Sequence, residues 1–344
     1  MTSSADTIFG PVVSPGDREP ACPICSFGGA AFFARGFDRL FGLARGSFRL
    51  FQCTSCGCVF QHPAPDEATI AGFYPDSYWW EEQRQGESLV ESALRRLERR
   101  YREFVAMDHV RFLLRCARQA RSSGRMLLDV GCGSGTFLHL ARKHGFEARG
   151  MDLSPQAVRV AQSQYGLDVR QGSMNSDAWQ GCRFDFITMF HVLEHLADPG
   201  KALGFAAAHL KPEGKLIVQV PNLHSLQARL FGTRWYGLDV PRHIVNFSPA
   251  GLRRLLANGG FAGETVARFS LRDNPAALAS SLVPGLDPIG RRGRRQQGRP
   301  FSEAAAELIY FGFVLAAFPF AVLESALGLG ATLWAQAALV RDRD

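Results

Sequence analysis

The segment LDVGCGSGTFL carries three glycines at alternate positions, directly after a short apolar run. Glycines spaced in this way permit a tight turn and let a ligand lie against bare backbone. Asp152 follows the first of them, Gly131, by twenty-one residues and closes the next strand-like run. A carboxylate there can accept hydrogen bonds from both hydroxyls of a ribose, so the pair predicts a cofactor that contains a nucleoside.

The residues around the glycine loop narrow the choice of nucleoside. A dinucleotide-binding loop would have a third glycine at position 136, where Thr136 stands, and a P-loop would continue into a lysine. Asp129 adds negative charge beside the loop, which repels phosphate and suits an ammonium group. A zwitterionic amino acid joined to adenosine therefore fits better than ATP or NAD.

Two CxxC pairs form a second chemical feature, made of Cys22, Cys25, Cys53 and Cys56. Two such turns can arrange four thiolates tetrahedrally around Zn²⁺. The 27 residues between the pairs exceed the commonest spacing, but they include FFARGF and SFRLFQC, which could form the strands of a zinc ribbon. We predict structural zinc here, with a redox dithiol and metal-free pairs as the alternatives.

Alternating apolar runs and amphipathic segments must position the glycine loop. Strands are expected at residues 126–131, 146–153, around 169, 183–190 and 214–221, with helices at 134–145, from 155 onward and at 198–210. Strands that alternate with helices predict right-handed βαβ units and an α/β fold with a doubly wound, mostly parallel, Rossmann-like sheet. Such sheets bind their ligands at the carboxyl ends of the strands.

Composition divides the 344 residues into four stretches and excludes some classes of protein. The stretches are a zinc-ribbon-like module at 1–65, an aromatic patch and Arg-rich helical arm at 66–123, a core at 124–271, and a basic loop, apolar segment and last strand at 272–344. With 46% hydrophobic and 21% charged residues the chain is not disordered, and its net charge of +7 permits anionic partners. Eight cysteines without a visible export signal favour metal or free thiols and a cytoplasmic protein.

Several segments together resemble one enzyme family. LDVGCGSGTFL resembles the glycine motif of class I S-adenosylmethionine-dependent methyltransferases, and GMDLSPQAV, FDFITMFHVLEHLADP and LKPEGKLIVQVPN resemble its later motifs in the same order. A zinc ribbon, then YPDSYWW, then this core resembles bacterial methyltransferases that modify sugars or other secondary metabolites. The resemblance implies in-line methyl transfer to a small metabolite, such as a nucleotide-sugar, a saccharide or a lipid-linked intermediate. It also implies an antiparallel last strand, best matched by 331–340, with 272–330 as an insertion before it.

The resemblance also assigns the cofactor-binding residues. The glycines would lie against the methionine portion of S-adenosylmethionine, with Asp129 near its amino group. Asp152 would hold the ribose and Leu153 the adenine, although a serine replaces the acidic residue that usually reads the adenine amine. The full set is Asp129, Gly131, Gly133, Gly135, Asp152, Leu153, Ser173, Met174, Phe190 and His191.

Histidines are the candidate catalytic bases. A base is needed when the acceptor is a hydroxyl, a protonated amine or an acidic carbon, and His195 and His243 are the candidates. His191 and His195, four residues apart, are expected on one helical face. Structural histidines, or a metal site of His191, Glu194 and His195, are the alternatives. Tyr74 and Tyr78 could line the acceptor pocket or merely pack between the modules.

Two further stretches bear on partners. Four arginines on one face of the helix expected over 90–120 permit an RNA-methyltransferase alternative, but the acids among them favour an ordinary solvated helix. The uncharged tract 308–323 spans about 24 Å as a helix, short of the ~30 Å bilayer core, and Pro319 is expected to interrupt it. Arginines precede this apolar tract, so the stretch 291–340 could contact a membrane surface. Alternatively, the tract could pack on the core of the protein or on a second subunit of a homodimer. A noncatalytic scaffold docked on RNA or membrane is the remaining alternative.

Overall fold

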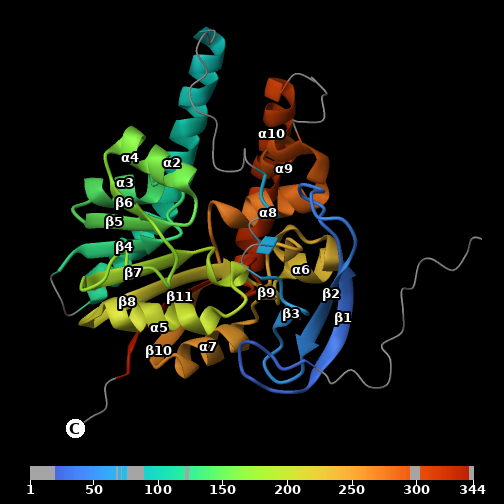
Figure 1. Ribbon diagram of the computed structural model, residues 1–344. Helices are drawn as coiled ribbons and strands as arrows, with labels where there is room; N and C mark the ends of the chain where they lie inside the picture. Colours follow the sequence, from blue (N-terminus) through green and yellow to red (C-terminus); the bar gives the residue numbers. More distant parts are fainter. Residues whose placement is uncertain are drawn as a thin grey trace, which may run out of the picture.

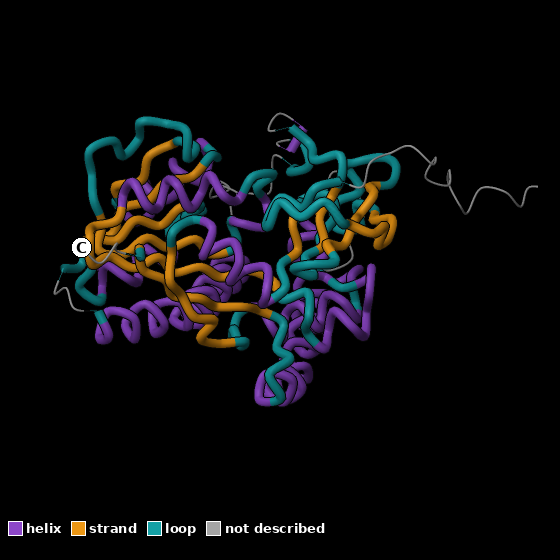
Figure 2. The backbone as a smooth tube through the Cα atoms, turned by 90° about the horizontal axis from the view of Figure 1, so that it is seen from below, coloured by secondary structure: helices purple, strands orange, loops and turns teal. Residues whose placement is uncertain are grey.

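The computed structural model describes residues 20–66, 69–70, 72–75, 89–120, 124–294 and 303–340. It contains a seven-stranded sheet with the order β10-β11-β8-β7-β4-β5-β6 and a four-stranded sheet with the order β1-β2-β3-β9 (Figure 1). Seen from below, the two groups of strands lie on opposite sides of the molecule (Figure 2). The predicted α/β fold with a mostly parallel sheet is confirmed.

The larger sheet follows the apolar runs of the sequence. Its parallel strands are β4 (Met126–Val130), β5 (Glu147–Asp152), β6 (Asp168–Gln171), β7 (Phe184–Phe190) and β8 (Leu210–Pro221). The last strand, β11 (Thr332–Leu339), runs antiparallel between β8 and β10 (Phe261–Ala267). The predicted antiparallel last strand is therefore confirmed, whereas β10 was not predicted.

Helices cover both faces of this sheet (Figure 1). One face carries α2 (Leu89–Gln119), α3 (Thr136–Lys143) and α4 (Pro155–Tyr165), and the other carries α5 (Pro199–His209) and α7 (Pro249–Asn258). Three of them begin with a capping side chain followed by proline, a pair that satisfies a free backbone N–H and starts the helical backbone. The caps are Ser154, Asp198 and Ser248.

The cysteine module forms the smaller sheet. Its predicted strands are present as the antiparallel pair β1 (Ala30–Gly36) and β2 (Phe48–Cys53), followed by β3 (Val59–Gln61). The fourth strand, β9 (Val245–Asn246), comes from the chain beyond β8 and pairs with β3. The module also shares one hydrophobic core with the larger sheet. The segment around β9 joins it to the residues just beyond β7 and β8, because the Ile244 N–H donates to the Glu194 carbonyl oxygen and Asn222 pairs with Phe247.

Between β10 and β11 the chain forms α8 (Asp273–Leu282), α9 (Pro288–Arg294) and α10 (Glu303–Ala326). The prediction that Pro319 interrupts the apolar tract is wrong, because Pro319 lies inside α10. A proline removes one backbone hydrogen bond, and the neighbouring turns, which bury Ala317 and Ala321, maintain the helix. The apolar span Ala305–Ala326 has 22 residues and a mean hydropathy of 2.0, so by length and composition it could cross a membrane.

Candidate cofactor and acceptor site

The glycine loop lies between β4 and α3. Gly131, Gly133 and Gly135 have φ angles of 72°, 53° and 79°, in the left-handed region that favours glycine. A β-carbon on Gly131 would approach the side chain of Val192, beyond β7, to 2.7 Å. The loop therefore presents backbone at close range, as a bound ligand requires.

Asp152 lies at the end of β5, opposite this loop, and is 4% exposed. Its Oδ2 accepts a hydrogen bond from the Gly133 N–H at 2.8 Å, and its Oδ1 accepts one from the Ser154 N–H at 2.8 Å. Burial raises the pKa of Asp152, and these N–H groups oppose that rise. The structure thus brings together the two features that the sequence associated with a nucleoside.

Asp129 lies at the same edge of the sheet and is also 4% exposed. Thr188 Oγ1 donates a hydrogen bond to Asp129 Oδ1 at 2.6 Å. Burial raises the pKa of Asp129 to about 7, with the nearby charge of Asp152 adding to the rise and the Thr188 hydrogen bond opposing it. A cationic ligand group would stabilise the ionised carboxylate, and this fits the ammonium of an amino acid.

The other predicted cofactor residues line the neighbouring strand ends. Leu153 is 68% exposed just beyond β5, an unusual exposure for a leucine that adjoins a buried strand. After β6, the Ser173 hydroxyl accepts a hydrogen bond from the Asn175 N–H at 3.2 Å, so it is engaged in a local turn. Met174 packs against the hydrophobic core.

Phe190 ends β7 among other rings. Its ring centroid lies 4.5 Å from that of His109, 5.0 Å from Phe137 and 5.6 Å from Trp334. His109 is 2% exposed, and burial lowers its pKa to about 3, so it is neutral. Its Nε2–H donates to Gln219 Oε1 at 2.8 Å.

The expectation that His191 and His195 share a helical face is wrong. His191 has a φ of 57°, and only a short 3₁₀ turn, Leu193–His195, follows it. Its Nδ1 lies 2.9 Å from Glu194 Oε1 and its Nε2 3.3 Å from Asp273 Oδ2. Burial lowers the pKa of His191, but the two carboxylates outweigh this effect and raise it to about 10. His191 is therefore an imidazolium that joins the end of β7 to α8.

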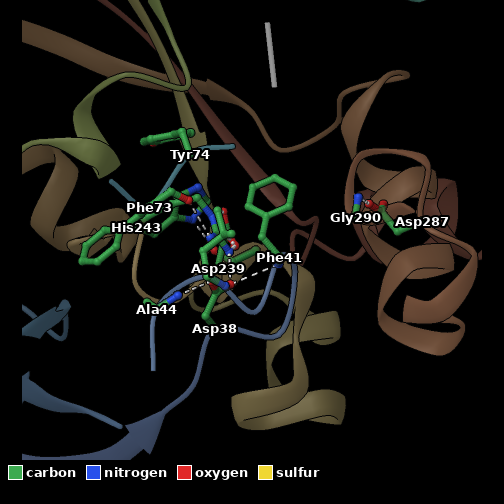
Figure 3. A network of polar contacts seen from close by, with 12 residues as sticks. Asp38, Phe41, Ala44, Phe73, Tyr74, Asp239, His243, Asp287 and Gly290 are labelled. Carbon is green, nitrogen blue, oxygen red and sulfur yellow. Dashed lines mark hydrogen bonds and ion pairs between the residues drawn. The ribbon is translucent and has the colours of Figure 1, made fainter. Parts of the chain in front are cut away.

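His195 and His243 lie together at the carboxyl edge, with a ring-centroid distance of 4.7 Å. His195 Nδ1 is 3.0 Å from the Tyr74 hydroxyl and 3.1 Å from the Arg242 carbonyl oxygen. Burial and the neighbouring His243 lower the pKa of His195 to about 4, so its ring is neutral near pH 7. Figure 3 shows Tyr74 and His243 in the same group of polar contacts, whereas Tyr78 lies outside the described residues.

The hydrogen bond of His243 defines its tautomer. Its Nδ1 lies 2.8 Å from the Gly237 carbonyl oxygen, which can only accept a hydrogen bond. In the neutral ring, Nδ1 therefore carries the proton and Nε2 carries the lone pair. His243 is 9% exposed, so its ring lies in a site that is largely shielded from solvent.

Some residues of the site were missed or grouped differently by the sequence analysis. Glu194, His195 and His243 have ligand atoms within 4.8 Å of one another and could hold a metal ion, with His243 where the sequence suggested His191. The left-handed backbone of His191 turns its ring toward Asp273 instead. Glu194 is fully buried, and its Oε2 has no hydrogen-bond partner among the described residues. The sequence analysis named Glu194 only in the alternative metal site, and it missed Asp273, which no local sequence signal marks.

The four predicted zinc ligands also come together. The sulfur atoms of Cys22, Cys25, Cys53 and Cys56 all lie within 4.8 Å of one another. Cys22 and Cys56 approach to 3.6 Å, as do Cys25 and Cys53. Four thiols converging in a small module are the donor set that zinc prefers.

Comparison with known proteins agrees with this geometry. Residues 95–266, half of the chain, match the family model described as a methyltransferase domain. The chain belongs to the S-adenosylmethionine-dependent methyltransferases. The cysteine module and helices α8, α9 and α10 lie outside the matched residues of this methyltransferase.

Its relatives include ubiquinone biosynthesis O-methyltransferases. The methyltransferase is 31% identical over 138 residues to that of Coxiella burnetii, covering 39% of this chain and 56% of the relative. It is 31% identical over 185 residues to that of Xanthomonas axonopodis pv. citri, covering 47% of this chain and 77% of the relative. A solved S-adenosylmethionine-dependent methyltransferase from Thermotoga maritima is 18% identical, with a TM-score of 0.42. The match covers 73% of this chain and 96% of the solved one. The chain thus spans little more than half the length of the first of these relatives.

Proposed function

We propose that this methyltransferase transfers the methyl group of S-adenosylmethionine to a hydroxyl oxygen of a small metabolite. The observation that carries the proposal is the pair of imidazoles beside Tyr74, the buried His243 and the half-buried His195, at the edge of the sheet where ligands bind. A hydroxyl needs a base to accept its proton, whereas a neutral amine does not. The names of the two relatives, both O-methyltransferases, support the same choice of atom.

The residues of the glycine loop and the two aspartates fit the cofactor. Gly131, Gly133 and Gly135 would approach the methionine portion, Asp129 would pair with its ammonium group, and Asp152 would accept from the ribose. When bound, S-adenosylmethionine supplies a methyl group that is already activated on a sulfonium. Leu153, Ser173 and Met174 would surround the adenine, while Phe190 and His191 would close the methionine end.

His243 is the proposed general base. Its Nδ1–H donates to the Gly237 carbonyl oxygen, so Nε2 is free to accept the proton of the acceptor hydroxyl. His195 stays neutral and, held by Tyr74 and Arg242, would orient the acceptor beside His243. A positioned base of this kind accelerates proton transfer by ~10²–10⁴-fold.

The cysteine module is proposed to hold one structural Zn²⁺ through Cys22, Cys25, Cys53 and Cys56. The convergence of the four sulfur atoms supports this. Zinc contributes ~10–16 kcal/mol to the folding of comparable modules, and here it would add to the hydrophobic core that the module shares with the larger sheet. The metal would therefore stabilise the wall of the acceptor site rather than react.

Helix α10 supports a peripheral contact with a membrane. Its buried stripe against α8 consists largely of small residues, including Ala306, Ala317 and Ala321. Larger apolar side chains point away from the protein, with Leu308 69% and Leu315 59% exposed. This reverses the usual arrangement of a surface helix. In the sequence, a basic stretch at 291–299 precedes α10, and such a stretch suits anionic lipid headgroups. A lipid-linked saccharide is one acceptor that would be met at such a surface.

The test is a methyl-transfer assay on hydroxylated metabolites with isotopically labelled cofactor. His243→Gln should lower kcat by ~10²–10⁴-fold while cofactor affinity stays unchanged, because a base contributes to the proton transfer alone. His209→Gln is the matched control, since His209 lies on α5 and its Nδ1 also bonds to a backbone carbonyl. Full activity of His243→Gln would contradict the proposed role of His243, and products methylated only at nitrogen or carbon would contradict O-methylation.

A further inference from the structure

A small hollow lies between the cysteine module and the loop that leads to His243. It is formed by the end of β1, by Arg39 and by one loop of the core, and its volume is about 40 Å³. The lining residues of that loop are Thr233, Trp235, Tyr236, Leu238, Asp239 and Val240. A single water requires roughly 10–15 Å³ by this kind of measure, so the hollow can admit a small polar group such as a phosphoryl but not a whole nucleotide. Neither the cofactor nor the base proposed above uses it.

Two arginines without an ion-pair partner among the described residues lie at or next to this hollow: Arg39 is part of its lining, and Arg234 stands between two lining residues, Thr233 and Trp235. Arg39 belongs to the module and Arg234 to the core loop, and burial together with the charge of Arg234 lowers the pKa of Arg39. Within the described part of the chain neither arginine has an ion-pair partner. Two guanidinium groups held near each other without a counterion favour the binding of an anion, and their planar donors match phosphate oxygens.

The nearby carboxylates of Asp38 and Asp239 do not neutralise Arg39 and Arg234, because both carboxylates form ion pairs with Arg242. Arg242 Nη2 lies 2.9 Å from Asp38 Oδ1 and 2.6 Å from Asp239 Oδ1, and its side chain is 1% exposed. Figure 3 shows Asp38 and Asp239 in this network of polar contacts. Its Nη1 also donates to the Phe73 carbonyl oxygen at 3.3 Å. The two aspartates and three arginines therefore keep a net positive charge of one on the module-core boundary.

A further donor lies at the hollow. Trp235 contributes to its lining and is 2% exposed, and its indole N–H has no hydrogen-bond partner among the described residues. An unpaired buried donor is costly, at about 1–3 kcal/mol, unless a ligand accepts from it. Guanidinium and indole groups only donate, so the complementary ligand is rich in acceptors.

The hollow adjoins the proposed acceptor site through one loop. The Asp239 carbonyl oxygen accepts from the His243 N–H at 2.9 Å, and the Gly237 carbonyl oxygen bonds to His243 Nδ1. We propose that Arg39 and Arg234 bind the phosphate or diphosphate group of the acceptor, so that the substrates are phosphorylated metabolites. The proposal rests on the proposed function and adds the substrate class. The diphosphate could belong to a sugar nucleotide or to a lipid-linked sugar.

The experiment is calorimetric titration of the full-length protein with inorganic pyrophosphate. Binding should weaken at least about tenfold in Arg39→Ala and in Arg234→Ala, since each removes a charge-assisted contact of about 1.5–3 kcal/mol. Arg253→Ala, an exposed arginine of α7, is the matched control and should bind as the wild type does. Trp235→Phe keeps the charge and the aromatic packing and should weaken binding by less than either arginine variant.

Two further titrations distinguish the source of the diphosphate. If uridine diphosphate binds more tightly than pyrophosphate, the acceptor is linked to a nucleotide. If farnesyl diphosphate binds more tightly than pyrophosphate, the acceptor is linked to a lipid. The anion site would be overturned if pyrophosphate did not bind, or if both arginine variants bound it as tightly as the wild type. Because cofactor binding and methyl transfer to neutral hydroxylated acceptors are measured separately, that outcome would leave the proposed O-methylation standing.

Discussion

The backbone N–H of Gly133 donates to the buried carboxylate of Asp152 at 2.8 Å, so the glycine loop and the end of β5 form one unit. The second oxygen of Asp152 accepts from Ser154 at the start of α4. The carboxylate is thus oriented by two backbone donors, and each of its oxygens retains a lone pair for a ligand. A change at this single side chain would disturb both the ligand contact and the loop.

Asp152→Ala should abolish measurable binding of S-adenosylmethionine. The variant loses hydrogen bonds to a charged acceptor, each worth about 1.5–3 kcal/mol, so affinity should fall by about 100-fold or more. Asp152→Asn keeps one acceptor oxygen, so its affinity for S-adenosylmethionine should lie between those of the wild type and Asp152→Ala. Calorimetry measures the affinities, with the exposed Asp168→Ala in β6 as control. Unchanged affinity in Asp152→Ala would remove the basis for the assigned ribose contact.

Asp129 should make both stability and cofactor affinity depend on pH. Its pKa of about 7 in the fold exceeds the value near 4 of an unfolded aspartate, so the folded state is favoured while Asp129 is protonated. The free energy of unfolding without ligand should therefore decrease from about pH 4 to pH 7, by up to about 4 kcal/mol. Affinity for the ammonium-bearing cofactor should increase over the same range. Asp129→Asn should flatten both curves, and parallel curves in wild type and variant would refute the assignment.

Removal of the metal should unfold the cysteine module. We expect about one zinc per chain by native mass spectrometry, as four thiolates complete one tetrahedral site. Cys22→Ser and Cys56→Ser should lose the metal and lower the melting temperature, because both cysteines belong to the core shared with the larger sheet. Cys182→Ser, outside the cluster, should keep both zinc and stability. A metal-free wild type with the same melting temperature after chelation would argue against structural zinc.

The outward face of α10 should bind anionic vesicles. In a sedimentation assay, Leu315→Asp should reduce the bound fraction at least about tenfold, because inserting an apolar leucine contributes about 1.5–3 kcal/mol. Leu230→Asp is the control, since Leu230 is 62% exposed on α6 (Leu226–Phe231) rather than on α10. Retention of vesicle binding in Leu315→Asp would favour a protein partner for this face.

Local patterns were sufficient to predict much of the fold. Apolar runs of strand length predicted β4, β7 and β8, because a strand buried on both faces needs continuous apolar side chains. The more polar β5 and β6 were predicted from residues 146–153 and from Val169. The Ser154-Pro155 pair predicted the start of α4, since capping depends on neighbours in the chain. The spacing of Gly131 and Asp152 similarly predicted a ligand edge, because β4 and β5 are adjacent parallel strands. Features of this kind involve residues close together in the chain or elements of one regular sheet.

Other features depended on contacts between residues far apart in the chain. Asp273 reaches His191 from the insertion, Arg242 joins Asp38 of the cysteine module, and β9 completes a sheet begun by β1. None of these pairs shares a sequence period or a fixed spacing. Likewise, the packing of α10 on α8 allows Pro319 within a helix that local preference would interrupt. The sequence by itself determined the sheet and its ligand-binding edge, while tertiary packing decided which ionisable groups meet there, because their charges and strained backbones are stabilised only by distant partners.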